Sequence, residues 1–84
     1  MRRDRISIIA DILEVLNRKQ IPKTAIVYSA NLNFNRASLY LDMMLRKNLI
    51  EKESNKYMIT NLGKEYLHKI NDLEGIFDGE NPFK

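Results

Sequence analysis

Residues 46–67, RKNLIEKESNKYMITNLGKEYL, constrain the fold more than any other part of the chain. Asn48 follows a helix-like run, at the place where helices favour a residue with left-handed backbone, and asparagine is the usual choice after glycine. Two short apolar runs, 49–52 and 57–59, flank the polar loop ESNK and predict a β-hairpin. Thr60 then suits the start of another helix. The stretch therefore predicts a helix, a small hairpin and a second helix.

The chain has 84 residues and no cysteine. A chain this short forms one small domain that buries only about 60–65% of its unfolded surface, and no disulfide can support it. The lack of cysteine fits a reducing compartment. No apolar run approaches the ~20 residues needed to span a membrane, and the start MRRDRISII lacks a signal-peptide pattern. We therefore expect a cytoplasmic protein with no membrane contact.

Helical periodicity predicts three helices before the hairpin and one after it. Asp4 and Asn33 are suitable N-caps for the first and third helices, and Pro22 suits the first turn of the second. Gly63 weakens the last helix by up to about 1 kcal/mol relative to alanine, so we expect close packing there. Gly75 and Gly79 are expected to end that helix early. The expected helices cover residues 5–18, 23–30, 34–47 and 61–73.

The domain is expected to cover residues 1–73, with a basic arm at 1–4 and a mobile acidic tail at 74–84. The tail holds three acidic residues and one lysine, whereas the rest of the chain holds 13 basic and 8 acidic residues. A basic body of this kind permits nucleic-acid binding without requiring it.

The element order is that of a helix-turn-helix followed by a hairpin, or wing. A third helix braced by the second can lie in a major groove of DNA. Backbone N–H groups at the start of the second helix and the hairpin tip can contact phosphates. The expected fold class is mainly α, a winged helix-turn-helix of four helices with a two-stranded wing.

The sequence NLNFNRASLYLDMMLRKNLIEKESNKYMITNLGKEYLHKI resembles winged-helix domains, with Tyr-Leu, Leu-Ile, a short hairpin and then Thr-x-x-Gly-x-x-Tyr-Leu. More narrowly, residues 8–73 are similar to the small, roughly ten-kilodalton archaeal winged-helix proteins that bind DNA as dimers. The resemblance implies a homodimer that binds double-stranded DNA. Ala25 departs from the pattern, because a basic residue often follows the threonine of the second helix in such proteins. The last motif of the pattern consists here of Thr60, Gly63, Tyr66 and Leu67.

Arg36 is the first candidate for base contact, because it lies in the first turn of the expected recognition helix and arginine can read guanine through two hydrogen bonds. Each candidate also has an ordinary interpretation as a solvated surface side chain. Together they offer four to six phosphate contacts, which predicts a log–log salt slope of roughly −4 to −5. The expected DNA-binding residues are Lys23, Thr24, Asn35, Arg36, Ser38, Asn55, Lys56, Arg2 and Arg3.

The first helix carries an apolar arc of roughly 180°, wider than the ~100° stripe of an ordinary surface helix. The arc fits a core helix covered on two sides, and it also fits a helix that meets a second chain. The last helix has apolar residues at a spacing close to that of coiled coils. Whether a dimer uses the first helix, the last helix or both is left open. The expected interface residues are Ile8, Ile12, Leu62, Tyr66, Ile70 and Leu73.

Nothing in the sequence favours catalysis. His68 is the only histidine, and no metal-ligand spacing, carboxylate cluster or phosphate-binding glycine loop is present. We expect no enzymatic activity, cofactor, metal or small-molecule substrate.

The expected function is sequence-specific or general DNA binding, through a recognition helix at 34–47 and a wing at 50–59. Such a protein would regulate transcription or associate with chromatin. The alternative is a winged-helix module that binds another protein and not DNA, since fold alone does not determine function. That alternative predicts an exposed apolar patch on the third helix, formed by Leu39 with Met43.

Overall fold

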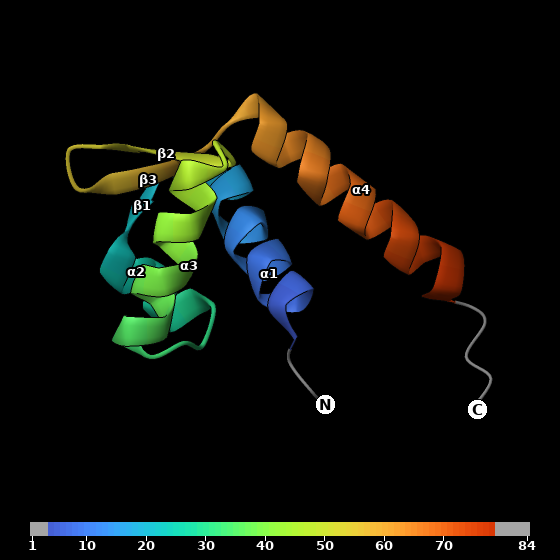
Figure 1. The fold of residues 1–84 in the computed structure, drawn as a ribbon, viewed down its shortest axis with the longest axis horizontal. Helices are drawn as coiled ribbons and strands as arrows, with labels where there is room; N and C mark the ends of the chain where they lie inside the picture. Colours follow the sequence, from blue (N-terminus) through green and yellow to red (C-terminus); the bar gives the residue numbers. More distant parts are fainter. Residues whose placement is uncertain (1–3, 79–84) are drawn as a thin grey trace.

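The computed structural model describes residues 4–78, which form four helices and a small antiparallel sheet at one edge of the fold (Figure 1). The predicted winged helix-turn-helix architecture is confirmed. Arg2, Arg3, Gly79 and Pro82 lie outside the described residues. The elements are α1 (Arg5–Arg18), β1 (Ile21–Pro22), α2 (Lys23–Ser29), α3 (Phe34–Arg46), β2 (Ile50–Glu53), β3 (Lys56–Ile59) and α4 (Asn61–Asp78).

The starts of α1 and α3 are set by the predicted caps. The Asp4 carboxylate accepts a hydrogen bond from the Ser7 N–H at 2.8 Å, and the Asn33 side-chain oxygen accepts one from the Arg36 N–H at 2.8 Å. Each bond satisfies a backbone donor that has no partner within the first turn. Pro22 is the N-cap of α2 and has an extended backbone, and the helix begins at Lys23 as predicted but ends at Ser29, one residue before the predicted end.

The sheet has three strands in the order β1–β3–β2, where the sequence predicted two. Ile21 pairs with Tyr57, which places the two-residue strand β1 beside the hairpin. A strand this short has no periodicity from which it could be predicted. The hairpin loop is also shorter than predicted, because Glu53 already pairs with Lys56 and only two residues form the turn.

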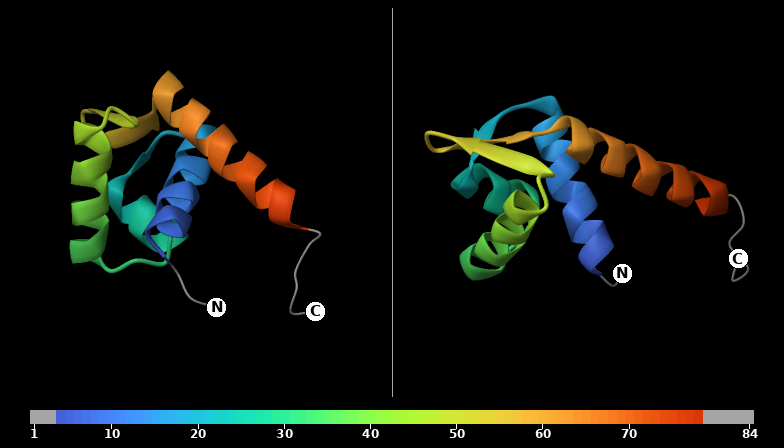
Figure 2. Two further views of the ribbon diagram at one scale, coloured as in Figure 1. Left: turned by 45° about the vertical axis from the view of Figure 1, so that its right-hand side comes forward. Right: turned by 45° about the horizontal axis from the view of Figure 1, so that its top comes forward.

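The core forms around α1, which lies between α3 on one side and α4 on the other (Figures 1 and 2). Ile8, Ile12 and Leu13 of α1 have no solvent exposure. The proposed dimer role of Ile8 and Ile12 is therefore wrong, since this chain's own core already covers both side chains. The other buried apolar residues include Leu16, Ile26, Ala30, Ala37, Leu41, Met44, Leu49, Ile50, Tyr57 and Leu67.

The junction between the hairpin and α4 is held by one threonine. The Thr60 hydroxyl lies 2.6 Å from the Asn48 carbonyl oxygen and 3.0 Å from that of Leu49, and it accepts a hydrogen bond from the Gly63 N–H. Asn48 has a φ of 60°, the predicted left-handed conformation. A methyl group at Gly63 would collide with the Leu49 carbonyl oxygen and lie 2.7 Å from Ile59 Cγ1. The predicted close packing at Gly63 is confirmed.

The last helix is longer than predicted. It continues through Gly75 to Asp78, whereas the sequence prediction ended it at residue 73. A single glycine costs a helix only about 1 kcal/mol, and a Cβ at Gly75 would meet nothing within 4 Å. Gly75 therefore adopts helical geometry without a steric need for glycine.

Candidate nucleic-acid interface

The outward face of α3 is the first part of the candidate interface. Its inner face, formed by Ala37, Leu41 and Met44, is buried against the core. Asn35 and Arg36 are exposed at the start of the helix, as a recognition helix requires. Asp42 and Arg46 are also exposed, farther along the helix.

Two α3 residues differ from their expected roles. Ser38 is only half-exposed, and its hydroxyl donates a hydrogen bond to the Phe34 carbonyl oxygen at 3.1 Å. Its donor is thus already used within the helix. Leu39 is 69% exposed, one helical turn from Arg36 on the outward face. An exposed Leu39 is predicted from the sequence only under the alternative, protein-binding interpretation.

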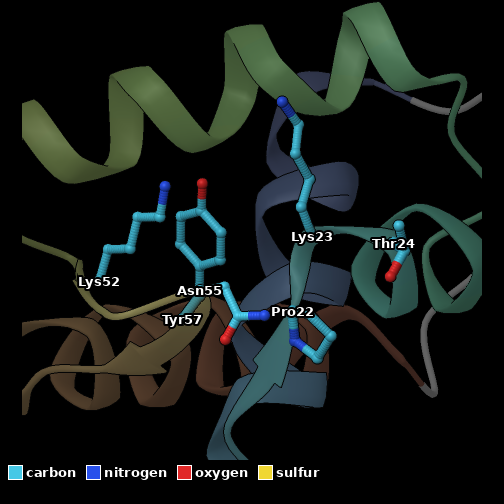
Figure 3. Close-up of a pocket in the computed structure, with 6 residues that line it drawn as sticks. All are labelled: Pro22, Lys23, Thr24, Lys52, Asn55 and Tyr57. Atoms are coloured by element: carbon cyan, nitrogen blue, oxygen red, sulfur yellow. The ribbon is translucent and has the colours of Figure 1, made fainter.

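A pocket of about 290 Å³ between the start of α2 and the hairpin is the second part of the interface (Figure 3). It brings together three residues predicted from the sequence, which are Lys23, Thr24 and Asn55. It adds Lys52 and Tyr57, which the sequence pattern does not indicate as site residues. The described residues that line it are Pro22, Lys23, Thr24, Lys52, Asn55 and Tyr57.

Each pocket lysine lies over an aromatic ring. Lys23 Nζ is 4.4 Å from the centroid of the Phe34 ring, and Lys52 Nζ is 5.5 Å from that of Tyr57. Both distances are within the ~6 Å range of a cation–π interaction. Phe34, 53% exposed, thus contacts Lys23 from the start of α3. The two rings hold the ammonium groups in place without neutralising their charge.

The sheet register separates the two hairpin lysines. Lys52 pairs with Tyr57, whereas Lys56 pairs with Glu53. Because alternate residues of a strand point to opposite faces, Lys56 lies on the face away from Tyr57. The hairpin signal in the sequence could have identified Lys52 only if the register had been known.

An apolar stripe on α4 forms a separate surface. Leu62, Tyr66 and Leu73 are 37%, 46% and 58% exposed, and Ile70 is half-buried. Their spacing of three to four residues places them on one face of the helix. The α4 part of the predicted dimer surface is therefore accessible in the single chain.

No other described feature indicates a chemical site. His68 is exposed and lies 3.4 Å from Asp72, an ordinary surface pair one helical turn apart. Within residues 4–78, no group of His, Cys, Asp or Glu could hold a metal ion. Among the described helices, none has the length and apolar character to cross a membrane.

Comparison with protein families gives a match over nearly the whole chain. A family model described as winged helix-turn-helix matches residues 2–77. Uncharacterized protein MJ0287 of Methanocaldococcus jannaschii is 29% identical over 79 residues, covering 94% of this chain and 81% of the relative. Uncharacterized protein MJ0290 of the same organism is 34% identical over 73 residues, covering 87% of this chain. The chain spans only 35% of the length of MJ0290.

Solved structures give the same architecture. Sso10a-2, a DNA-binding protein from Sulfolobus solfataricus, matches with a TM-score of 0.76 and 27% identity, covering 92% of this chain and 84% of that one. A homodimeric winged helix-turn-helix DNA-binding domain from Mycobacterium bovis matches with a TM-score of 0.62 and 20% identity, covering 84% and 72% of the two chains. Both structures share the arrangement of helices and hairpin seen here.

Proposed function

The chain belongs to the winged helix-turn-helix family, and on this premise we propose that it binds double-stranded DNA as a non-enzymatic regulator of transcription or chromatin-associated protein. The observation that carries the proposal is the exposed start of α3 beside a pocket with two lysines. The 27% identity to Sso10a-2, a DNA-binding protein, supports it.

In this proposal, α3 enters a major groove, which is about 12 Å wide and admits a helix. Arg36 donates two hydrogen bonds to a guanine, and Asn35 contacts a neighbouring base or phosphate. Leu39 lies against the methyl group of a thymine, an apolar contact that the major groove also offers. The hairpin, with Asn55 and Lys56, contacts the adjacent backbone. Arg2 and Arg3, which precede α1 in the sequence and lie outside the described residues, add basic charge.

The protein acts as a homodimer in this proposal. The apolar stripe of Leu62, Tyr66, Ile70 and Leu73 on α4 meets the same stripe of a second copy. The exposure of three of these side chains supports this arrangement, because apolar side chains that recur on one helix face are typical of helix pairing. Two symmetric copies would present two α3 helices to one duplex.

The test is fluorescence anisotropy with labelled duplexes of random and selected sequence at several salt concentrations. Wild type should bind both, with a salt slope of roughly −4 to −5 on random duplex. Arg36→Ala should weaken binding to the selected site by about tenfold or more and to random duplex much less. Lys56→Ala, the control for backbone contact, should weaken both alike. Equal losses for the two variants would contradict the role of α3 as the recognition helix.

One observation favours a second candidate function, a protein-binding module. Leu39, Tyr40 and Met43 of α3 and Arg5 of α1 line a shallow pocket of about 170 Å³. An exposed leucine beside such a pocket suits an apolar side chain of a partner. If wild type fails to bind random duplex even at low salt, DNA binding is excluded and this pocket becomes the leading surface.

A further inference from the structure

We infer that the pocket between the start of α2 and the hairpin holds one phosphodiester group of the DNA backbone, and that Lys23, Lys52 and the Tyr57 hydroxyl contact it. The inference rests on the proposed DNA binding and assigns a part of it to residues that the sequence did not indicate. Three properties of the pocket support the inference. They are the positive charge of its lining, the Tyr57 hydroxyl that opens into it, and the place of the pocket on the hairpin beside α3.

The charge of the pocket is positive and not neutralised locally. Of the six described residues that line it, two are lysines and none is acidic. Neither lysine forms an ion pair with a side chain that the structure describes. The Phe34 and Tyr57 rings instead hold the ammonium groups at 4.4 and 5.5 Å. Two positioned cations without a carboxylate partner favour an anion.

The Tyr57 side chain supplies a further donor. The residue as a whole is only 6% exposed. Its hydroxyl forms no hydrogen bond with a described side chain or backbone group and is open to solvent, because no buried polar side-chain atom among the described residues lacks a partner. Figure 3 shows this hydroxyl at the end of a ring that extends toward α3, beside the Lys52 ammonium group. A hydroxyl that opens into a pocket can donate a hydrogen bond to an acceptor on a ligand that enters the pocket. A phosphodiester carries oxygen acceptors and no donors, so it matches a lining of ammonium and hydroxyl groups.

The position of the pocket points to the backbone of DNA as the source of that group. In a duplex, one strand's phosphates separate each major groove from the neighbouring minor groove. A protein with α3 in the major groove and a hairpin toward the minor groove therefore has one phosphate strand between the two elements. Lys23, Lys52 and Tyr57 all extend from their strands or helix toward α3, into this gap (Figure 3). Asn55 and Thr24 at its edge offer further polar groups.

The inference is tested with Lys52→Gln and Tyr57→Phe, with Lys69→Gln on the exposed surface of α4 as the matched control. Binding of a random duplex is measured by anisotropy over a series of salt concentrations. Lys52→Gln should weaken binding about tenfold at low salt and reduce the magnitude of the log–log slope by about 1. Tyr57→Phe keeps the ring under Lys52 and should weaken binding about threefold to tenfold with the slope unchanged. Lys69→Gln should behave as wild type.

Three outcomes overturn the inference, and they separate it from the proposed function. If wild type binds duplex and Lys52→Gln matches Lys69→Gln in affinity and slope, the pocket does not hold a phosphate, while DNA binding stands. If wild type binds no duplex, both the phosphate site and the proposed DNA binding are contradicted. If Lys52→Gln leaves duplex binding unchanged but abolishes the effect of millimolar inorganic phosphate on the Tyr57 NMR signals, the pocket takes a small free anion and not DNA.

Discussion

The helices α1 and α4 both carry apolar faces that suggested a dimer surface, and the fold uses the two faces differently. Ile8, Ile12 and Leu13 of α1 are wholly buried within the chain. On α4, Leu67 is buried, whereas Tyr66 and Leu73 are 46% and 58% exposed. The helix with the wider apolar arc is therefore the one with less apolar surface left for a partner.

The number of neighbours explains this difference. Within the described residues, α1 packs against α2, β3 and α4, so side chains on several sides of it are covered. The main neighbours of α4 are α1 and β3, near its start, and the rest of the helix leads away from the body (Figure 2). A wide apolar arc thus indicates several neighbours within the chain, and a narrow stripe on a projecting helix indicates a surface for contact with another molecule.

The largest effect expected from this comparison is on the core face of α1. Ile12→Ala removes a fully buried side chain and should lower the free energy of unfolding by about 2–5 kcal/mol. Leu73→Ala, the control on α4, should change the unfolding of the monomer by less than about 0.5 kcal/mol. Urea denaturation at low protein concentration measures both. Similar losses for the two variants would contradict the assignment of the α1 face to the core.

A smaller effect is expected on assembly. Leu73→Glu removes an apolar contact of about 1–1.5 kcal/mol from each copy of the proposed dimer, so the dimer should be weaker by about 2–3 kcal/mol. Leu39→Glu places the same charge on another exposed leucine and should leave the dimer intact. Sedimentation velocity over a range of concentrations measures the dissociation constants. A dimer unaffected by Leu73→Glu would show that α4 is not its interface.

The smallest effects concern the two glycines of α4. Gly63→Ala should destabilise the protein by about 1–3 kcal/mol, because the methyl group meets the Leu49 carbonyl oxygen. The methyl group of Gly75→Ala would have no other atom within 4 Å. This substitution should stabilise the helix by about 0.5–1 kcal/mol, because alanine has less backbone freedom to lose on folding. Thermal unfolding followed by circular dichroism compares the two. Changes of the same sign would mean that α4 is not anchored at Gly63 in the way described.

The candidate site was only partly predictable. Lys23, Thr24 and Asn55 were selected because they begin a helix or lie in a turn, which are local features. Lys52 and Tyr57 were missed because their pairing depends on the strand register, and a shift of one residue would have placed Lys52 on the other face. The place of Ser38 on the outward helix face predicts a DNA contact, whereas its hydroxyl donates a hydrogen bond to the Phe34 carbonyl oxygen.

The sequence alone determined the features whose partners lie a few residues apart. The cap at Asp4, the cap at Asn33 and the left-handed Asn48 each depend on the geometry of one turn, so residue type is sufficient to predict them.

Tertiary structure decided how the apolar surface is divided and which distant residues meet. Ile8 and Ile12 have the same chemistry as residues of an interface, and only the packing of other helices and strands around α1 assigns them to the core. The strand β1 and the pocket between α2 and the hairpin likewise exist only because residues 21–24 come to lie beside residues 52–57. Contacts between such distant segments depend on the whole fold, so local propensity leaves them undetermined.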